Sequence, residues 1–285
     1  MELMLALAIN GIVWGLIIAL MALGLSIIFG LLDIINIAHG DFFMIGAVLA
    51  WTVATLTGNF WFAFFIVPII GFCLGVLIEY FAIRPIQSKA ALSIVATFGL
   101  SLILQESVRA TFGAAPQRLL PPVNATFNLL GLQYDWYRII AAGISLFVIC
   151  GFFLFLQRTK FGTWMRAVRL DPETATAMGI PTRRIYMATF AIGFAMAAVG
   201  GVVAAPITTV EFRLGADVLP FCFMAVIIGG LGNLPGTVLA AVLLAFLEGV
   251  ITSVTEPTIA RIVSLCLMCV VLLVRPNGIL VGAIK

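Results

Sequence analysis

The sequence predicts an all-α polytopic membrane protein, and three observations lead to this prediction. Hydrophobic residues make up 63% of the chain and charged residues only 9%, whereas a soluble domain has roughly a quarter of its residues charged. Uncharged apolar runs near 20 residues recur, which is the length that crosses a bilayer core about 30 Å thick. Segments of about ten residues that alternate polar and apolar, as a membrane β-barrel needs, are not found. We therefore expect one transmembrane domain over residues 1–285, with about eight membrane-crossing helices and one irregular hairpin.

Nine apolar segments are expected to provide the helices. The first has no charged residue between Glu2 and Asp33, so at 1.5 Å per residue it would exceed the bilayer unless it is tilted or broken. Gly24 and Gly30 are plausible break points. In order along the chain, the segments are 3–32, 42–57, 60–83, 90–112, 138–156, 185–207, 218–231, 234–252 and 258–274.

The seventh segment is too short to span a membrane comfortably, and it meets the eighth through a glycine-rich connection that breaks the helix. Such irregular backbone is tolerated at membrane depth only where it is buried in protein or lines a water-filled path. We expect a broken or re-entrant hairpin, and the sequence leaves open whether 218–252 crosses the membrane twice. As part of a translocation path or gate, this hairpin would contribute Gly229, Gly230, Gly232, Asn233 and Gly236.

A weaker pattern indicates an internal repeat. Each half of the chain places a glycine-rich helix before a polar, broken segment, at 33–41 in the first half and at 211–236 in the second. Transporters are often built from such repeats, with their sites near the membrane midplane at discontinuous helices.

The distribution of basic residues predicts the orientation. The loop 157–184 holds six of the fifteen Lys and Arg residues, which favours the cytoplasm for that loop. Counting crossings from it places the turn with Arg84 and Lys89, and the C-terminal end with Arg275 and Lys285, on the same side. The N-terminus and the loop 113–137 are then expected outside.

Enzyme activity and nucleic-acid binding are both disfavoured. The chain has no G-x-x-x-x-G-K-[ST] phosphate loop, so it is not expected to hydrolyse ATP itself. His39 is the only histidine, and no G-x-S-x-G motif surrounds a serine. The net charge of +3 does not indicate nucleic-acid binding, because the basic residues lie mostly in loops. Cys266 and Cys269 form a C-x-x-C without a second pair or a nearby histidine, and we expect them to be apolar packing residues.

A short polar segment between the first two helices is the strongest candidate for a site within the membrane. Asp33, Asn36 and His39 are three residues apart and would lie near one face of a helix. Asp41 follows a glycine and could cap the next helix. Capping and interhelical hydrogen bonding would explain these residues. A lining of the translocation path or a gate is the alternative, since ionisable residues at membrane depth are costly.

Three glutamates, Glu79, Glu106 and Glu248, also lie in or near apolar segments. Glu106 and Arg109 are i,i+3 neighbours that could form an ion pair. Structural pairing is favoured for all three, with proton coupling as the alternative.

The basic loop contains the pattern of a short docking helix. Asp171 reads as an N-cap with proline at the first helical position, and Gly179 ends the helix. Glu173-Thr-Ala-Thr-Ala-Met-Gly179 resembles the E-A-A-x-x-x-G core of the coupling loop in ABC importer permeases, with Thr174 in place of the first alanine. By this resemblance the residues that couple to an ATPase are Asp171, Glu173, Ala175, Ala177 and Gly179.

Three more stretches resemble the branched-chain amino-acid permeases, the LivH-like subunits. They are Leu23-Gly-Leu-Ser-Ile-Ile-Phe-Gly-Leu-Leu-Asp-Ile-Ile-Asn-Ile-Ala-His-Gly-Asp-Phe42, Val226-Ile-Ile-Gly-Gly-Leu-Gly-Asn-Leu-Pro-Gly236 and Leu273-Val-Arg-Pro-Asn-Gly-Ile-Leu280. They occur in the family's order and span most of the chain.

This resemblance implies a multi-pass subunit of an ATP-driven importer in the bacterial inner membrane, for branched-chain or other hydrophobic amino acids. The implied partners are a second, homologous permease, two ABC ATPase subunits that hydrolyse the ATP, and a periplasmic solute-binding protein. No cofactor is expected on this chain. Close relatives of such a subunit carry urea, short amides or other amino acids. A secondary carrier coupled to ions through Glu106 or Asp41 is the alternative from another class.

Overall fold

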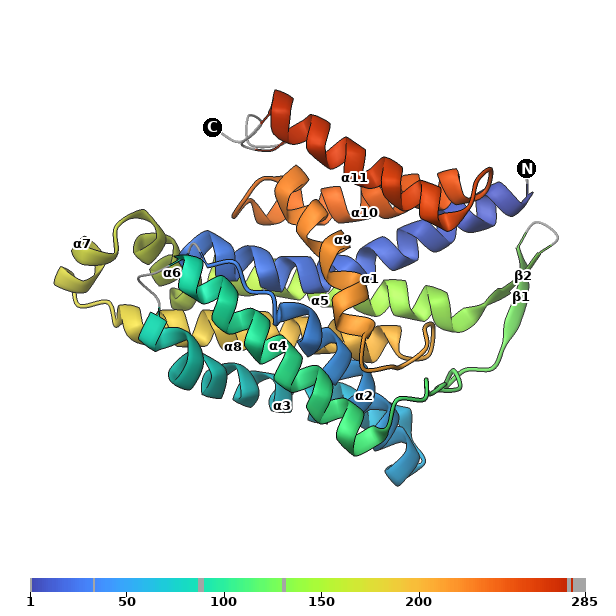
Figure 1. The fold of residues 1–285 in the computed structure, drawn as a ribbon, viewed down its shortest axis with the longest axis horizontal. Helices are drawn as coiled ribbons and strands as arrows, with labels where there is room; N and C mark the ends of the chain where they lie inside the picture. The colour runs from blue at the N-terminus through green and yellow to red at the C-terminus, as the bar shows by residue number, and fades with distance from the viewer. Residues whose placement is uncertain (1, 33, 87–89, 130–131, 276–277, 279–285) are drawn as a thin grey trace.

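The computed structural model describes residues 2–32, 34–86, 90–129, 132–275 and 278, and it is a helical bundle elongated along one axis (Figure 1). Asp33, Lys89, Lys285 and most of 276–280 lie outside the described residues, so their predicted roles have no structural counterpart here.

The predicted all-α membrane architecture is confirmed. Eight helices among the described residues are long and apolar enough to cross a membrane. They are α1 (Glu2–Leu32), α2 (His39–Thr57), α3 (Ala63–Ile78), α4 (Ala90–Phe112), α5 (Trp136–Arg158), α8 (Thr182–Ala204), α10 (Leu234–Thr252) and α11 (Pro257–Val274). The shorter elements are η1 (Phe60–Phe62), the π-helical turn η2 (Glu79–Ile83), η3 (Arg84–Ile86), β1 (Thr126–Leu129), β2 (Leu132–Asp135), α6 (Lys160–Leu170), α7 (Pro172–Ala177) and α9 (Leu214–Gly229).

Helices α1, α2 and α8 form the core of the bundle, and glycines let them pack backbone to backbone. A Cβ added at Gly46 of α2 would lie 2.1 Å from the Ala198 carbonyl oxygen of α8. One added at Gly201 of α8 would lie 2.0 Å from the Phe43 carbonyl oxygen of α2. In a membrane, where lipid is as apolar as leucine, such small residues at crossings drive helix association.

Of the two alternatives for the first helix, a tilt or a break, the break at Gly24 or Gly30 is wrong, because α1 continues without interruption to Leu32. Its two glycines serve close packing instead. A Cβ at Gly24 would lie 2.4 Å from the Gly193 carbonyl oxygen of α8, and one at Gly30 would lie 2.8 Å from the Gly232 Cα. Both positions therefore need a residue without a side chain for tertiary reasons.

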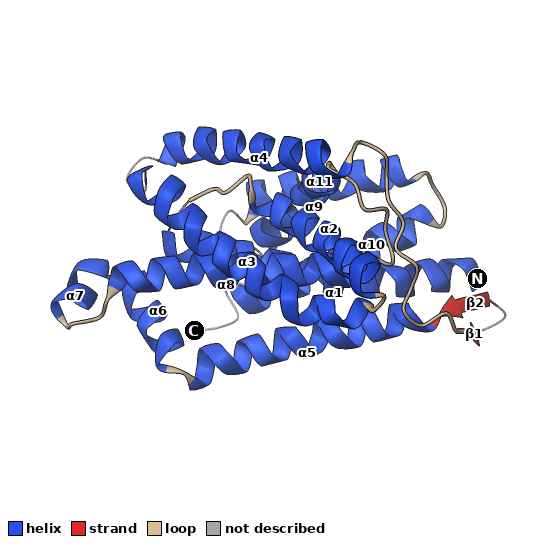
Figure 2. Cartoon of the chain, turned by 90° about the horizontal axis from the view of Figure 1, so that it is seen from below, coloured by secondary structure: helices blue, strands red, loops and turns tan. Residues whose placement is uncertain are grey.

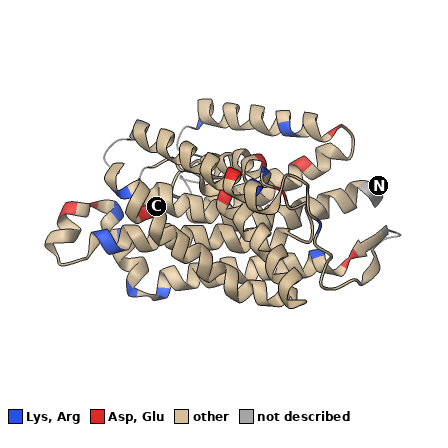
Figure 3. Ribbon diagram, turned by 60° about the horizontal axis from the view of Figure 1, so that its bottom comes forward, with Lys and Arg blue, Asp and Glu red and all other residues tan. Residues whose placement is uncertain are grey.

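The bundle has two chemically different ends. Helices α6 and α7 project at one end, and the β1–β2 hairpin lies at the other with the N-terminus (Figures 1 and 2). Lys and Arg positions gather around α6 and α7, and only a few lie near the β1–β2 hairpin (Figure 3). Because the C-terminal end of α11 points toward the α7 end, the N-terminus of α1 and the C-terminal end of α11 lie at opposite ends of the bundle (Figure 1).

The loop 113–137 contains structure that the sequence did not reveal. Strands β1 and β2 pair antiparallel, with Phe127 opposite Tyr134. Upstream of the hairpin, Gln117 and Val210 exchange two backbone hydrogen bonds of 2.9 and 2.8 Å. The loop is therefore fastened to the segment that joins α8 to α9.

Candidate functional site

The segment between α1 and α2 is not helical, and α4 supplies the groups that satisfy its backbone. Residues 34–38 form no helix, so Asn36 and His39 do not share the expected helical face, and Asp33 lies outside the described residues. The backbone N–H of Ile37 donates to the Thr97 hydroxyl oxygen of α4 at 3.2 Å. A break at this depth is tolerated because neighbouring protein replaces the missing helical bonds.

His39 begins α2 and is held by the core helices. Its Nε2 lies 3.0 Å from the Met21 carbonyl oxygen of α1 and donates to it, since a carbonyl can only accept. Its ring centroid is 5.6 Å from that of Phe194 on α8. The side chain is fully buried. His39 therefore makes an interhelical hydrogen bond that holds α2 against α1.

Asp41 does not cap α2, contrary to one of the expectations from sequence. The helix begins at His39 with Ala38 as its N-cap residue, and no side chain caps it. Asp41 instead accepts a hydrogen bond of 3.0 Å from the Gln105 side chain of α4, and Gln105 also donates to the Ser101 hydroxyl at 3.0 Å. The carboxylate is 1% exposed, so this contact links two helices inside the bundle.

A polar seam thus joins α4 to the start of α2, and we define it as Thr97, Ser101, Gln105 and Asp41. The three α4 residues are four positions apart, which places them on one face of the helix. The four-residue spacing of these polar residues is visible in the sequence. That they pack against Asp41 is visible only in the fold. Asn36 lies in the same break, 1% exposed, and neither its side-chain oxygen nor its nitrogen has a partner among the described residues.

The glycine-rich connection forms a tight turn between α9 and α10 at residues 230–233. Gly230 and Gly232 have φ values of +97° and +75°, which residues with a side chain rarely adopt. Asn233 caps α10 by accepting a hydrogen bond of 3.2 Å from the Gly236 backbone N–H. A Cβ at Gly229 would lie 2.4 Å from the Gly236 carbonyl carbon, so the two helix ends touch through their backbones. The predicted hairpin is present, and its two helices are in backbone contact next to the turn.

This turn is linked to the basic loop by one side chain. The Arg169 guanidinium of α6 donates to the Gly232 carbonyl oxygen at 2.9 Å. Gly30, near the end of α1, packs against the same glycine. Sequence reasoning missed this contact, since it joins residues that are far apart in the chain. A movement of α6 would therefore reach both the α9–α10 turn and the end of α1.

The basic loop contains a short helix, α7, at the position where the sequence predicts one. Asp171 caps it by accepting hydrogen bonds from the backbone N–H groups of Glu173 at 3.0 Å and Thr174 at 3.1 Å. Pro172 is the first helical residue, and Gly179 follows the helix with a φ of +83°. Glu173 and Ala177 are exposed, whereas Ala175 is 4% exposed and faces the rest of the chain. The amphipathic helix α6, which the sequence analysis did not identify, carries α7.

The Thr174 hydroxyl, followed by the Thr174 and Glu173 amides, lowers the pKa of Asp171 below its usual range. The cap is thus fully formed above the ordinary aspartate pKa and is lost only as the pH falls through the lowered value. Replacing Asp171 by alanine should speed hydrogen exchange of the Glu173 and Thr174 amides at pH 7 at least several-fold, whereas asparagine should keep most of their protection. Thr159→Ala, which removes the cap of α6, is the matched control and should leave α7 protected. Equal exchange in Asp171→Ala and the unmodified chain would contradict the cap.

A hollow of about 480 Å³ opens at the opposite end of the bundle. Its lining includes Trp51, Asn59, Trp61 and Arg118. It lies beside the fastened loop at 113–122 and far from α7. Within the described residues, no group of three His, Cys, Asp or Glu side chains could hold a metal ion.

Comparison with known proteins shows what the chain is similar to. The model of a family described as "Branched-chain amino acid transport system / permease component" matches residues 7–272. The chain is 29% identical to the high-affinity branched-chain amino acid transport system permease protein BraD of Pseudomonas aeruginosa, over 95% of this chain and 94% of BraD. It is 29% identical to the corresponding LivH protein of Escherichia coli, over 95% and 93% of the two chains. The permease protein LivM of Escherichia coli is 24% identical, over 92% of this chain and 67% of LivM. No solved structure gives a significant match.

Proposed function

Because the chain belongs to the family of branched-chain amino acid ABC transport permeases, we propose that it is a transmembrane subunit of an ATP-driven importer for branched-chain or other hydrophobic amino acids. A permease of this kind is a transport subunit and carries out no reaction of its own. In the proposed complex this chain supplies half of the translocation pathway, and ATP is hydrolysed by partner subunits.

The proposal rests mainly on the exposed position of α7, which projects from one end of the bundle. This capped, one-to-two-turn helix stands out from the bundle, with Glu173 and Ala177 exposed and Ala175 turned inward. Leu170 and Met178 on either side of it are 87% and 79% exposed. Large apolar side chains so exposed at the polar end of a membrane protein favour a protein partner. We assign that partner as an ABC ATPase.

The complete importer would contain a second homologous permease, two ATPase subunits and a periplasmic solute-binding protein. The similarity to both LivH-type and LivM-type proteins supports pairing between related permeases. With α7 in the cytoplasm, the C-terminal end of α11 lies on the same side, and the N-terminus and the β1–β2 hairpin lie outside. The chain then resides in the bacterial inner membrane with its 480 Å³ hollow facing the binding protein.

We propose that movement is transmitted through the contacts that α6 makes with the rest of the chain. Closure of the ATPases on ATP moves α7, and Arg169 transmits that movement to Gly232. The α9–α10 turn and the adjacent end of α1 shift together, because Gly30 and Gly232 are in backbone contact. The break at 34–38 and the start of α2, both bonded to α4 through the polar seam, are the second place where the pathway can open and close.

Purification of the tagged chain from its native membranes in a mild detergent tests the assembly. A P-loop ATPase and a second permease in stoichiometric amounts are the expected companions. A lone homo-oligomer that transports solute under an ion gradient without ATP would contradict the proposal. It would favour a secondary carrier instead.

Replacing Gly179 by alanine should lower ATP-driven uptake at least tenfold while the membrane helices stay folded. The φ of +83° would strain an alanine there and redirect the end of α7, although nothing lies within 4 Å of the added Cβ. Gly113 is a matched control, with a φ of +84° and equally open surroundings at the other end of the molecule. Gly113→Ala should suffer the same backbone strain but keep uptake within about twofold.

Replacing Glu173 by glutamine, with the exposed Glu256 as its control, tests the motif residue in the same assay. Normal uptake in both Gly179→Ala and Glu173→Gln would exclude α7 as the coupling element.

A further inference from the structure

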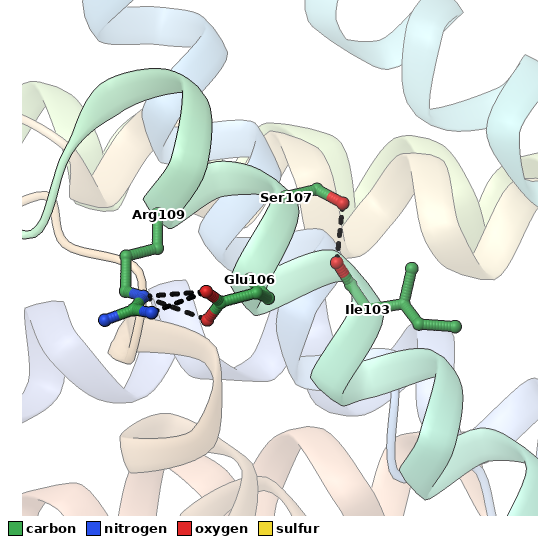
Figure 4. A network of polar contacts seen from close by, with 4 residues as sticks. All are labelled: Ile103, Glu106, Ser107 and Arg109. Carbon is green, nitrogen blue, oxygen red and sulfur yellow. Dashed lines mark hydrogen bonds and ion pairs between the residues drawn. The ribbon is translucent and has the colours of Figure 1, made fainter.

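An ion pair lies on the outer surface of α4, where a membrane helix would normally be apolar. The Arg109 guanidinium contacts the Glu106 carboxylate through Nη2 at 2.6 Å and through Nε at 2.9 and 3.1 Å (Figure 4). The Glu106 side chain is 62% exposed and that of Arg109 is 50% exposed. Among the described residues, neither has another hydrogen-bond partner. Both belong to the candidate membrane span Leu92–Phe112.

Glu106 lies on the side of α4 away from the polar seam, whereas Arg109 follows Gln105 by one turn at the edge of the seam face. Thr97, Ser101 and Gln105 hold one face of the helix against α2. At 100° per residue, Glu106 lies on the far side of the helix from Thr97, so it faces away from this chain's own bundle. Among the described residues, no other helix covers the Glu106 side chain, which is 62% exposed.

Lipid is a poor environment for this face. Glu106 is six residues from the end of α4, which places it about 9 Å inside the span. Ionisable side chains at such depth almost always face a bundle interior or a water-filled cavity, and they mark substrate pathways. The other membrane-depth ion pair, Glu248 with Arg261, bridges α10 and α11, and its glutamate is only 20% exposed. The Glu106–Arg109 pair makes no such link between helices.

We propose that Glu106 and Arg109 bind the charged groups of a zwitterionic solute within the pathway, an inference that rests on the proposed importer function. The guanidinium is a bidentate donor for an α-carboxylate, and the Glu106 carboxylate accepts hydrogen bonds from an α-ammonium group. In the absence of solute, the two side chains neutralise each other. Solute binding exchanges one ion pair for two, so no isolated charge remains in the membrane at either stage.

The neighbouring residues fit the remainder of such a solute. Leu102 and Ile103 lie one turn further into the span and are 52% and 63% exposed. Figure 4 shows Ile103 on the turn before Glu106, with its side chain directed away from the ion pair. An amino acid held at its charged end by Glu106 and Arg109 would therefore lay an apolar side chain on Leu102, which lies between them around the helix. The site selects for a zwitterion with an aliphatic side chain.

The test uses the complete importer, reconstituted in proteoliposomes and supplied with binding protein that carries radiolabelled leucine. We expect Glu106→Gln and Arg109→Gln each to lower leucine uptake at least tenfold. Recovery of the assembled complex and its ATP hydrolysis should stay within about twofold of the unmodified protein. Ser107→Ala is the control on the same helix, because its hydroxyl bonds only to the Ile103 carbonyl oxygen (Figure 4). Glu248→Gln is the control for loss of a charge at membrane depth.

A charge exchange separates recognition from a structural role. The double variant Glu106→Arg with Arg109→Glu keeps an i,i+3 ion pair but reverses its direction relative to Leu102 and Ile103. We expect its uptake to stay at least tenfold reduced. Restored uptake in the double variant, or normal uptake in both single variants, would overturn the proposal. Absence of ATP-driven uptake of leucine and of other hydrophobic amino acids by the unmodified complex would instead refute the proposed function, so the two failures are distinguishable.

Discussion

Replacing Gly46 by alanine is expected to lower the free energy of unfolding by about 3 kcal/mol, the upper end of the usual range for an overpacked core. The added Cβ would lie 2.1 Å from the Ala198 carbonyl oxygen and 2.7 Å from the Ala198 Cα. Both are backbone atoms, so no side chain can rotate away to make room. Relief requires α2 and α8 to separate, and these two helices, with α1, form the core of the bundle.

Thermal unfolding of the purified protein in detergent measures this effect. Gly143 in the middle of α5 is the control, because nothing lies within 4 Å of a Cβ added there. Gly143→Ala should keep or raise the melting temperature, since alanine is favoured over glycine in a helix by about 1 kcal/mol. If Gly46→Ala and the unmodified protein have the same melting temperature, the α2–α8 crossing is looser than the distances between Gly46 and Ala198 indicate.

Replacing Arg169 by glutamine is expected to separate ATP hydrolysis from transport. The side chain makes the hydrogen bond that joins α6 to the α9–α10 turn. A hydrogen bond to a charged group contributes about 1.5–3 kcal/mol, which corresponds to roughly ten- to hundredfold in an equilibrium between two conformations. Solute uptake should fall by about that factor, while ATP hydrolysis by the assembled complex continues.

Arg166 is the matched control on the same helix. Its guanidinium donates to the Leu156 carbonyl oxygen at 3.1 Å and to the Thr163 hydroxyl at 3.3 Å, so both hydrogen bonds stay within the α5–α6 corner. Arg166→Gln should leave uptake within about twofold. Gly232→Ala should resemble Arg169→Gln, because its Cβ would lie 2.5 Å from the Arg169 Nη2. Unimpaired uptake by Arg169→Gln would show that force reaches the turn by another route.

The helices could be predicted from the sequence because each depends on a local property, the length of an uncharged apolar run. The cap at Asp171 and the end of α7 at Gly179 are equally local, and the structure confirms both. The α9–α10 turn was found for the same reason, since four glycines and an asparagine within eight residues break a helix in any surroundings.

Contacts between distant segments could not be predicted in this way. The interpretation of Gly24 and Gly30 as breaks failed because a glycine inside a helix serves close packing as readily as interruption, and only the partner helix distinguishes the two. Asp41 was expected to cap α2, but its carboxylate bonds to Gln105, 64 residues further along the chain. Arg169 and Gly232 are similarly remote from each other in sequence.

The packing of α1 against α10 has a consequence for how the chain is made. Gly11 and Gly15 of α1 touch the backbone of α10 at Ala245 and Val242. Because α10 is synthesised roughly 200 residues after α1, at about 5–20 residues per second this glycine face waits about 10–40 s for its partner. During most of translation the nascent protein therefore exposes an unmatched helix surface to the membrane insertion machinery. A product truncated before α10 would keep that surface and become a substrate for membrane quality control.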